Sequence, residues 1–325
     1  MSVNFLVTLV IPILNEAESL PELLQALKAQ SHRPDEIIFS DAGSSDGSPT
    51  MIKAWWREEG WENASCRVLS LPGAMPGAGR NAGVQAARNE WIAFIDGGIT
   101  PASDWLEQLC RHAQAKQSPV VFGVCHFSAQ TRFAKAVCAL SYGHGRELPV
   151  LPASLFARRV FTEIGWFPAN LRSAEDLVWI SALQKLYGPK EVCWVARVSY
   201  THFPMSWREA FRKWRIYELN LLMAGVRIRQ QALYLTGLPV LYVSVGAGGL
   251  AGFTLFLMYL LLRGVIDPIR RSSDWPWWGC QPGSAFITLP LAVVLDIAKW
   301  TGIVQGVLAK LVSWSGFGGK QHVHR

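Results

Sequence analysis

An apolar run, a polar turn and a helical pattern follow one another three times at the start of the chain, and this alternation restricts the fold more than any other feature. The apolar runs span residues 6–14, 36–40 and 67–71, and a fourth run, 91–95, follows the third helical segment. Such runs are typical of strands that are buried on both faces. Because strands that alternate with helices pair in parallel, the sequence predicts an α/β fold with a mostly parallel, Rossmann-like sheet and flanking helices.

The fourth apolar run ends at Asp96, which is followed by Gly97 and Gly98. Ligands of open α/β sheets bind beyond the carboxyl ends of the strands, so this carboxylate is placed for chemistry. The two glycines allow a tight turn and let a bulky polar ligand approach the chain. Taken alone, the segment is equally consistent with a strand followed by a plain Asp-Gly-Gly turn.

Charge is distributed unevenly along the chain. Residues 1–200 hold 18 Lys and Arg against 19 Asp and Glu, whereas residues 201–325 hold 13 against 5. Much of the excess lies on a predicted basic amphipathic helix over residues 206–229. Because long apolar runs follow it, the pattern favours a membrane surface over nucleic acid as the partner of this region.

Two apolar runs predict membrane helices near residues 233–262 and 286–312, each longer than the ~20 residues that span a bilayer. The second run contains Asp296 and Lys299, which are one helical turn apart and able to pair. Three tryptophans between the runs suit a membrane interface, namely Trp275, Trp277 and Trp278. Because Pro239 and the glycines after it can interrupt a helix, three membrane helices are an alternative to two. A soluble protein in which these runs form core helices is a further alternative.

We therefore expect a catalytic domain over residues 1–229 and a membrane region over residues 230–325. Basic flanks before Gln230 and after Leu308 predict an inner-membrane protein whose catalytic domain faces the cytoplasm. The N-terminus resembles a first strand rather than a signal peptide. The six cysteines lack the paired spacing of a metal site, so we expect reduced core residues.

A predicted helix begins at Glu175 and Asp176. Acids in a first turn are favoured by the helix dipole, so plain helix-terminal charges are an alternative to a catalytic role. Residues 126–152 are consistent with either an acceptor-side flap or an interfacial helix, and the sequence does not decide between them.

These motifs, in this order, resemble the family 2 glycosyltransferases of the GT-A fold over most of residues 5–220. Val10-Ile11-Pro12 with Asn15-Glu16 is similar to the family's opening strand and loop, and the segment 40–47 is similar to its nucleotide-binding turn. Arg80-Asn81-Ala82-Gly83 and the run ending at Asp96 match the next two blocks. Glu175-Asp176 matches the acidic pair whose Asp is the family's catalytic base. Each motif alone is weak, but their order and spacing are specific.

The resemblance implies an inverting glycosyltransferase that moves a sugar from a nucleotide diphosphate, UDP in first place, to a hydroxyl of a lipid-linked or membrane-proximal glycan. Asp176, with Glu175 beside it, would take the acceptor proton. Asp41 can accept from a uracil N–H or sugar hydroxyls, and Arg80 can face the phosphates. The implied donor-binding residues are Pro12, Asn15, Glu16, Asp41, Arg80 and Asp96. The partners implied are the nucleotide sugar, the acceptor and membrane lipid, with no nucleic acid.

The resemblance also implies a divalent cation, Mg²⁺ or Mn²⁺, held at Asp96 with His202 near the diphosphate or the metal. One departure concerns this cation, because Gly98 stands where the family usually has the second Asp of Asp-X-Asp, the direct metal ligand. A cation would have fewer carboxylates here, although water and diphosphate oxygens can complete its shell. A non-catalytic relative that serves as a binding or scaffold subunit of a polysaccharide assembly complex is therefore the alternative. A dinucleotide-dependent enzyme is disfavoured, because the glycine-rich loop 73–83 does not open the first strand–helix unit.

Overall fold

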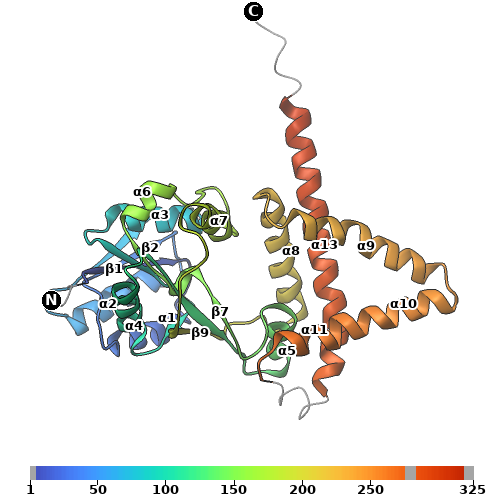
Figure 1. The fold of residues 1–325 in the computed structure, drawn as a ribbon, viewed down its shortest axis with the longest axis horizontal. Helices are drawn as coiled ribbons and strands as arrows, with labels where there is room; N and C mark the ends of the chain where they lie inside the picture. The colour runs from blue at the N-terminus through green and yellow to red at the C-terminus, as the bar shows by residue number, and fades with distance from the viewer. Residues whose placement is uncertain (1–4, 275–282, 318–325) are drawn as a thin grey trace, which may run out of the picture. The chain divides into compact units, whose positions relative to one another are not determined.

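The computed structural model describes residues 5–274 and 283–317, and these residues form two compact units (Figure 1). Unit 1 comprises residues 5–128 and 147–202, and unit 2 comprises the other described residues. This division does not test the predicted domain boundary at residue 229, which stays a prediction. The predicted interfacial tryptophans Trp275, Trp277 and Trp278 lie outside the described residues.

The sheet of unit 1 runs in the order β3-β2-β1-β4-β8-β6-β9-β5, with β7 paired to β6. The pairs among β1, β2, β3 and β4 are parallel, as is β6 with β9, whereas β8 lies antiparallel between β4 and β6. The predicted α/β fold with a mostly parallel sheet is confirmed. The strands are β1 (Val7–Ile13), β2 (Glu36–Asp41), β3 (Ser65–Ser70), β4 (Trp91–Phe94), β5 (Thr100–Pro101), β6 (Val120–Phe127), β7 (Arg146–Pro149), β8 (Leu155–Ala157) and β9 (Val192–Tyr200).

Helices flank this sheet, and their starts follow the predicted turns. They are α1 (Leu20–Lys28), α2 (Ser48–Glu59), α3 (Pro76–Ala86), α4 (Trp105–Lys116), the short 3₁₀ turn η1 (Leu151–Ala153), α6 (Arg159–Ile164) and α7 (Glu175–Tyr187). The sequence also suggests a capping box of Ser19 and Glu22 at α1, and this prediction is wrong. The Ser19 hydroxyl donates to the Glu16 carboxylate instead, and Glu22 accepts from Thr100. The Ser19 hydroxyl is therefore bonded to Glu16, which precedes the helix, and not to a helix N–H group.

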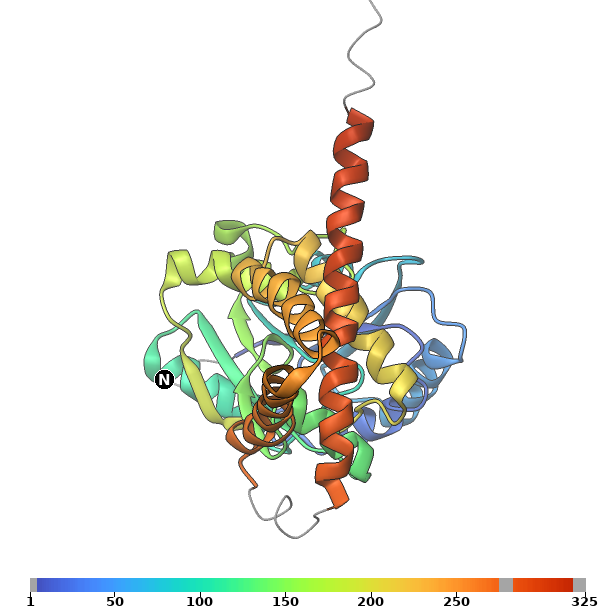
Figure 2. The same ribbon diagram turned by 90° about the vertical axis from the view of Figure 1, so that its right-hand side faces the viewer.

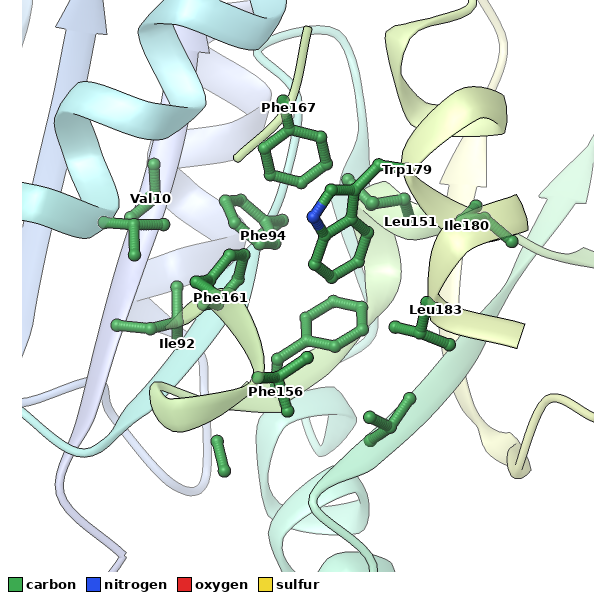
Figure 3. Close-up of a cluster of buried hydrophobic side chains, with 14 of the residues drawn as sticks. Val10, Ile92, Phe94, Leu151, Phe156, Phe161, Phe167, Trp179, Ile180 and Leu183 are labelled. Carbon is green, nitrogen blue, oxygen red and sulfur yellow. The ribbon is translucent and has the colours of Figure 1, made fainter. Parts of the chain in front are cut away.

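An aromatic cluster joins β4 to α7 in the core of unit 1 (Figure 3). Phe94, Phe161, Phe167 and Trp179 contact one another, and the Phe167 and Trp179 ring centroids are 4.6 Å apart. The Trp179 indole N–H donates to the Gly165 carbonyl at 2.8 Å. Burial of each such side chain stabilises the fold by about 1.5–3 kcal/mol. This packing places the first turn of α7 near the carboxyl end of β4.

Unit 2 is helical. Its helices are α5 (Arg132–Ser141), α8 (Trp207–Met223), α9 (Ile228–Gly246), α10 (Gly249–Leu261), the π-helical turn η2 (Leu262–Ile266), α11 (Asp267–Arg271) and α13 (Gly283–Phe317). Figures 1 and 2 show α8 beside the long α13, while α9 and α10 fold back on each other. The apolar run near 233–262 is thus divided between α9 and α10. The break falls at Gly248 and Gly249, whose φ angles of 74° and 84° cannot continue a helix.

Two segments of unit 2 are long and apolar enough to cross a membrane by length and composition alone, Gly249–Arg271 and Phe286–Val312. A buried polar cluster lies between these helices and α9. Its centre is Asp296, and the predicted pair with Lys299 is formed, at 3.3 Å. The carboxylate also accepts hydrogen bonds from Arg263, Tyr234 and Tyr259. Because each donor belongs to a different helix or turn, this one acid connects α9, α10, η2 and α13.

Candidate functional site

The loop after β1 and the turn after β2 are joined by hydrogen bonds into one piece. The Asn15 side-chain oxygen accepts from the Ser45 N–H at 2.9 Å, and the Asn15 N–H donates to the Ser44 hydroxyl at 2.9 Å. The Glu16 N–H donates to the Ser48 hydroxyl at 3.0 Å. Asn15 has a φ of 56°, a left-handed conformation that asparagine tolerates better than most residues. The two predicted donor-binding loops therefore hold each other in place.

Asp41 ends β2 and closes the turn that follows it. Its side chain accepts from the Ser44 N–H at 2.9 Å and from the Ser44 hydroxyl at 2.6 Å, and the residue is only 5% exposed. Pro12, in β1, pairs with Ser40 next to Asp41 and lies against Gly79 of α3. Pro12 and Asp41 are thus near the carboxyl edge of the sheet.

Arg80 is held between two carboxylates. Its helix, α3, lies so close to β1 that a side chain on Gly83 would collide with Val10. The Arg80 guanidinium is 4% exposed and donates to Glu175 Oε1 at 2.5 Å and to Asp96 Oδ1 at 2.7 Å. The side chain that the sequence predicts to face phosphates therefore links the end of β4 to the start of α7.

The network of Arg80, Asp96 and Glu175, called here the Arg80 network, is not fully satisfied. Arg80 Nε and Glu175 Oε2 are buried without a hydrogen-bond partner in the described part of the chain. Burial raises the pKa of Glu175, the charge of Asp176 adds to this rise, and Arg80 opposes it. Burial also opposes the charge of Arg80, but the carboxylates around it keep the Arg80 pKa above its ordinary value. The network keeps the Arg80 guanidinium charged but leaves the buried Glu175 carboxylate incompletely hydrogen-bonded.

The two acids of α7 have different surroundings. Glu175 is 4% exposed and belongs to the Arg80 network, whereas Asp176 is half-buried and accepts only the N–H of Leu177 among the hydrogen bonds that the structure gives it. Ala174, directly before them, has a φ of 70°, which is costly for a residue with a Cβ. Of the pair, Asp176 is the carboxylate that can meet a substrate.

A cavity of about 410 Å³ opens beside the end of β4. Residues from three loops line it, among them Asn15, Glu16, Asp96, Gly98, Tyr200 and His202. The Asp96 side chain is 37% exposed, and the Tyr200 hydroxyl donates to the His202 carbonyl at 2.7 Å. The structure thus gathers four of the predicted site residues at the cavity. Pro12, Asp41, Arg80, Glu175 and Asp176 do not line it.

Three residues at the site have no role in the predictions. Ser19 orients Glu16, Asn81 exchanges two hydrogen bonds with the backbone of Phe167, and Lys190 lies close enough to Asp176 for their charges to interact. Burial lowers the pKa of Lys190, and the charge of Asp176 opposes this change. Asn81 could have been found, since it follows Arg80 in a matched motif. Ser19 and Lys190 carry no comparable signal in the sequence.

Comparison with known proteins places this geometry in a family. A family model described as "Glycosyl transferase family 2" matches residues 8–214. A pre-mycofactocin glycosyltransferase of Mycobacterium tuberculosis is 29% identical over 53% of this chain and 37% of its own length. Glycosyltransferase AglE of Haloferax volcanii is 25% identical over 53% of this chain and 59% of its own length. The chain therefore spans less than two thirds of the length of these relatives.

A solved structure supports the fold. The mannosyltransferase PcManGT of Pyrobaculum calidifontis, in complex with GDP-Man and Mn²⁺, aligns with a TM-score of 0.57 over 90% of this chain and 86% of its own. Its sequence is 15% identical, so the likeness concerns the fold alone. The predicted GT-A fold is confirmed by this match.

Proposed function

This chain belongs to glycosyl transferase family 2, and on that premise we propose that it is an inverting glycosyltransferase. The donor is a nucleotide-diphosphate sugar, with UDP as the first choice, and the acceptor is a hydroxyl of a lipid-linked or membrane-proximal glycan. One observation carries the proposal. At the carboxyl edge of a parallel sheet, Asp176 is left accessible beside Glu175, which the Arg80 network holds in place.

In the reaction we propose, Asp176 is the general base. It takes the proton from the acceptor hydroxyl as that oxygen forms a bond to the anomeric carbon, while the bond from this carbon to the diphosphate oxygen breaks and the diphosphate keeps the electron pair. Attack opposite the leaving group inverts the anomeric centre, through a transition state with oxocarbenium character. Asp176 is suited to this work because it is half-buried and lies outside the ion pairs of the Arg80 network.

We assign Arg80 a positioning role in place of direct phosphate binding. Both of its terminal nitrogens donate to protein carboxylates, so its charge is already engaged. Through these bonds Arg80 sets the distance between Asp96, on the donor side, and the helix that carries Asp176. Asn15, Glu16 and Asp41 then contact the nucleotide sugar through the two loops that they hold together, with Pro12 supporting them from β1.

A divalent cation accompanies the donor in this proposal. When bound, such an ion would neutralise charge on the diphosphate and ease its departure. The residues present fit this use in part, because the partly exposed Asp96 carboxylate and the His202 ring line the same cavity. In the described part of the chain, no three His, Cys, Asp or Glu side chains are gathered into a site that could hold a metal unaided. Donor oxygens and water therefore have to supply the other ligands.

Unit 2 attaches the enzyme to the inner membrane in our proposal, with the catalytic domain on the cytoplasmic side. The two long apolar segments support this, as do the exposed apolar side chains of α9 and α10, which include Leu233, Val243, Leu250 and Phe253. Sodium carbonate extraction of membranes tests it. Retention of the full chain in the membrane fraction is expected, and its release by carbonate would contradict the anchor.

A donor screen tests the proposed activity. The detergent-purified chain is heated in the presence of UDP, GDP and dTDP sugars, with and without Mn²⁺, and the bound donors are then offered to lipid-linked acceptors. We expect one nucleotide to raise the melting temperature and its sugar to appear on the acceptor with inverted anomeric configuration by NMR. Donor binding without hydrolysis or transfer would favour the alternative, a scaffold subunit of a polysaccharide assembly complex, to which Gly98 gives some support.

A further inference from the structure

Gly98 removes the acid that the cation would normally meet, but the structure places another carboxylate in the same space. A Cβ atom built on Gly98 would lie 4.0 Å from Glu16 Oε2 and 3.8 Å from His202 Cδ2. A short acidic side chain at position 98 would thus extend toward the place that the Glu16 carboxylate already occupies. Glu16, Asp96, Gly98 and His202 all line the cavity at the end of β4.

Gly97 shows how Glu16 reaches this place. A Cβ on Gly97 would lie 2.8 Å from Glu16 Cγ, closer than unbonded carbon atoms approach, and 3.1 Å from its Cδ, which is a tight contact. The Glu16 stem therefore lies against the backbone of residue 97, and the absence of a side chain there makes room for it. With glycine at both positions 97 and 98, the loop after Asp96 carries neither a second acid nor an intervening side chain, and the space left accommodates one glutamate from the loop after β1.

The Glu16 side chain is held in this orientation by its own loop. The Ser19 hydroxyl donates to Glu16 Oε2 at 2.7 Å, and the Glu16 carbonyl accepts the N–H groups of Ser19 and Leu20. The Glu16 N–H is fixed by the Ser48 hydroxyl. A carboxylate whose backbone and side chain are both fixed is a preorganised ligand, which reduces the ordering that metal binding must impose.

We propose that Glu16 supplies the carboxylate missing at position 98, so that Glu16 and Asp96 form the protein's share of a cation site at the donor diphosphate. This inference rests on the proposed function, because the diphosphate provides the remaining ligands. Two carboxylates suit Mn²⁺, which prefers oxygen ligands and can take the others from the diphosphate and water. Since no complete site is formed by the described side chains, Mn²⁺ binding should depend strongly on the nucleotide.

The test is Mn²⁺ binding to the full chain in detergent, followed by the EPR signal of free Mn²⁺, alone and with UDP or GDP. Glu16→Gln keeps the size of the side chain and an oxygen that can accept from Ser19, but removes the charge. We expect it to weaken nucleotide-dependent Mn²⁺ binding by at least ~10–100-fold, the range seen when even an outer partner of a metal site is lost. Glu22→Gln, an exposed acid on α1, is the control and should leave Mn²⁺ binding unchanged.

The decisive experiment moves the carboxylate from position 16 to position 98. Gly98 does not have a positive φ, and a Cβ there meets only ordinary contacts, so we expect this position to accept aspartate. The double variant Glu16→Gln/Gly98→Asp should recover Mn²⁺ binding to within a few-fold of the wild type. If it does not fold, Glu16→Asp takes its place, and its Mn²⁺ affinity should lie between those of Glu16→Gln and the wild type.

Two results would overturn the inference. One is a Glu16→Gln variant that binds Mn²⁺ as the wild type does, while Asp96→Asn loses it. The other is a wild type that transfers sugar fully in excess chelator and binds no Mn²⁺ with either nucleotide. In both cases the proposed sugar transfer stands, although the second result removes the cation from it, because transfer would fail on a separate observation, namely the absence of any nucleotide-sugar binding or transfer in the donor screen.

Discussion

Two buried glutamates of unit 1 are each paired with an arginine, yet their pKa values move in opposite directions. Glu36, at the amino end of β2, accepts from the Arg67 guanidinium at 2.6 Å, the Thr8 hydroxyl at 2.8 Å and the Arg88 N–H at 2.9 Å. Burial opposes its charge, but these hydrogen bonds outweigh burial and hold the Glu36 pKa below its ordinary value. Glu175, with one oxygen unpartnered among the described residues, has a pKa raised mainly by burial.

This difference between Glu36 and Glu175 indicates that the two ends of the sheet have different roles. At the amino end, both Glu36 oxygens accept hydrogen bonds and the arrangement stabilises the fold, although Arg67 Nε is buried without a partner among the described residues. At the carboxyl end, the Arg80 network leaves two buried atoms unpartnered within the described residues and follows a strained Ala174. Unsatisfied groups and strained backbone cost free energy and persist where function requires them.

The largest effect is expected at the functional end, from Asp176→Asn. The amide keeps the shape of the side chain but cannot accept the acceptor proton, so transfer should fall by roughly 10²–10⁴-fold. Nucleotide-sugar binding, followed by melting temperature, should stay near the wild-type value. Glu58→Gln, an exposed acid on α2, is the control. Transfer within a few-fold of wild type in the Asp176 variant would remove this residue from the mechanism.

Exchanging each buried glutamate for glutamine compares the two ends directly. Glu36→Gln leaves Arg67 without its carboxylate and should cost about 1–3 kcal/mol of folding stability. Glu175→Gln should cost less stability, because it removes a carboxylate that is itself unfavourably buried, while transfer falls as the start of α7 loses its anchor. Thermal melting and transfer assays on both variants measure the pair. The contrast between the ends breaks if Glu175→Gln is the more destabilising of the two.

Much of the fold, and the position of several site residues at strand and helix ends, could be predicted from the sequence. The apolar runs gave β1, β2, β3 and β4 to within a few residues, and the alternation with helices gave their parallel pairing. Asp96 and the acids of α7 were predicted to lie at strand and helix ends on the carboxyl side, where the structure has them. These features are local, since each depends on residue types within one short segment.

The Arg80 network could not be predicted in the same way. Arg80 and Glu175 are 95 positions apart, and their contact depends on how closely α3 approaches β1, which a single glycine decides. The position of Glu16 against Gly97 is equally nonlocal. The capping-box motif failed at Ser19 for a related reason, because the Ser19 hydroxyl donates to the acid three residues before it and makes no cap hydrogen bond with a helix N–H group.

The pH dependence of stability should differ in sign between the two glutamates. The Glu36 pKa is lowered from 4.5 by folding, so its stabilisation is present above that value and is lost as pH falls through the folded pKa. The Glu175 pKa is raised from 4.5, so its contribution is present below that value and is lost as pH rises through the folded pKa. The curve of melting temperature against pH should therefore be flatter than that of the wild type on the acid side for Glu36→Gln. For Glu175→Gln it should be flatter above about pH 4.5, the usual range of a glutamate pKa. Parallel curves for the two variants would contradict the assignment.

The smallest effect is expected from Ala174→Gly, which tests whether the functional end stores strain. At a φ of 70° the Cβ of an alanine costs about 1–2 kcal/mol, and the extra chain freedom of glycine in the unfolded state takes back about 0.5–1 kcal/mol. The variant should thus be more stable than wild type by up to about 1 kcal/mol, a rise in melting temperature of roughly 2–4 °C for a domain of this size. Ala26→Gly, inside α1, is the control and should be destabilised by about 0.5–1 kcal/mol. If Ala174→Gly lowers the melting temperature as the control does, the left-handed backbone before Glu175 carries no strain. If it raises the melting temperature and lowers transfer, the strain holds the acids in their working orientation, and the two ends of the sheet differ in the way that their glutamates indicate.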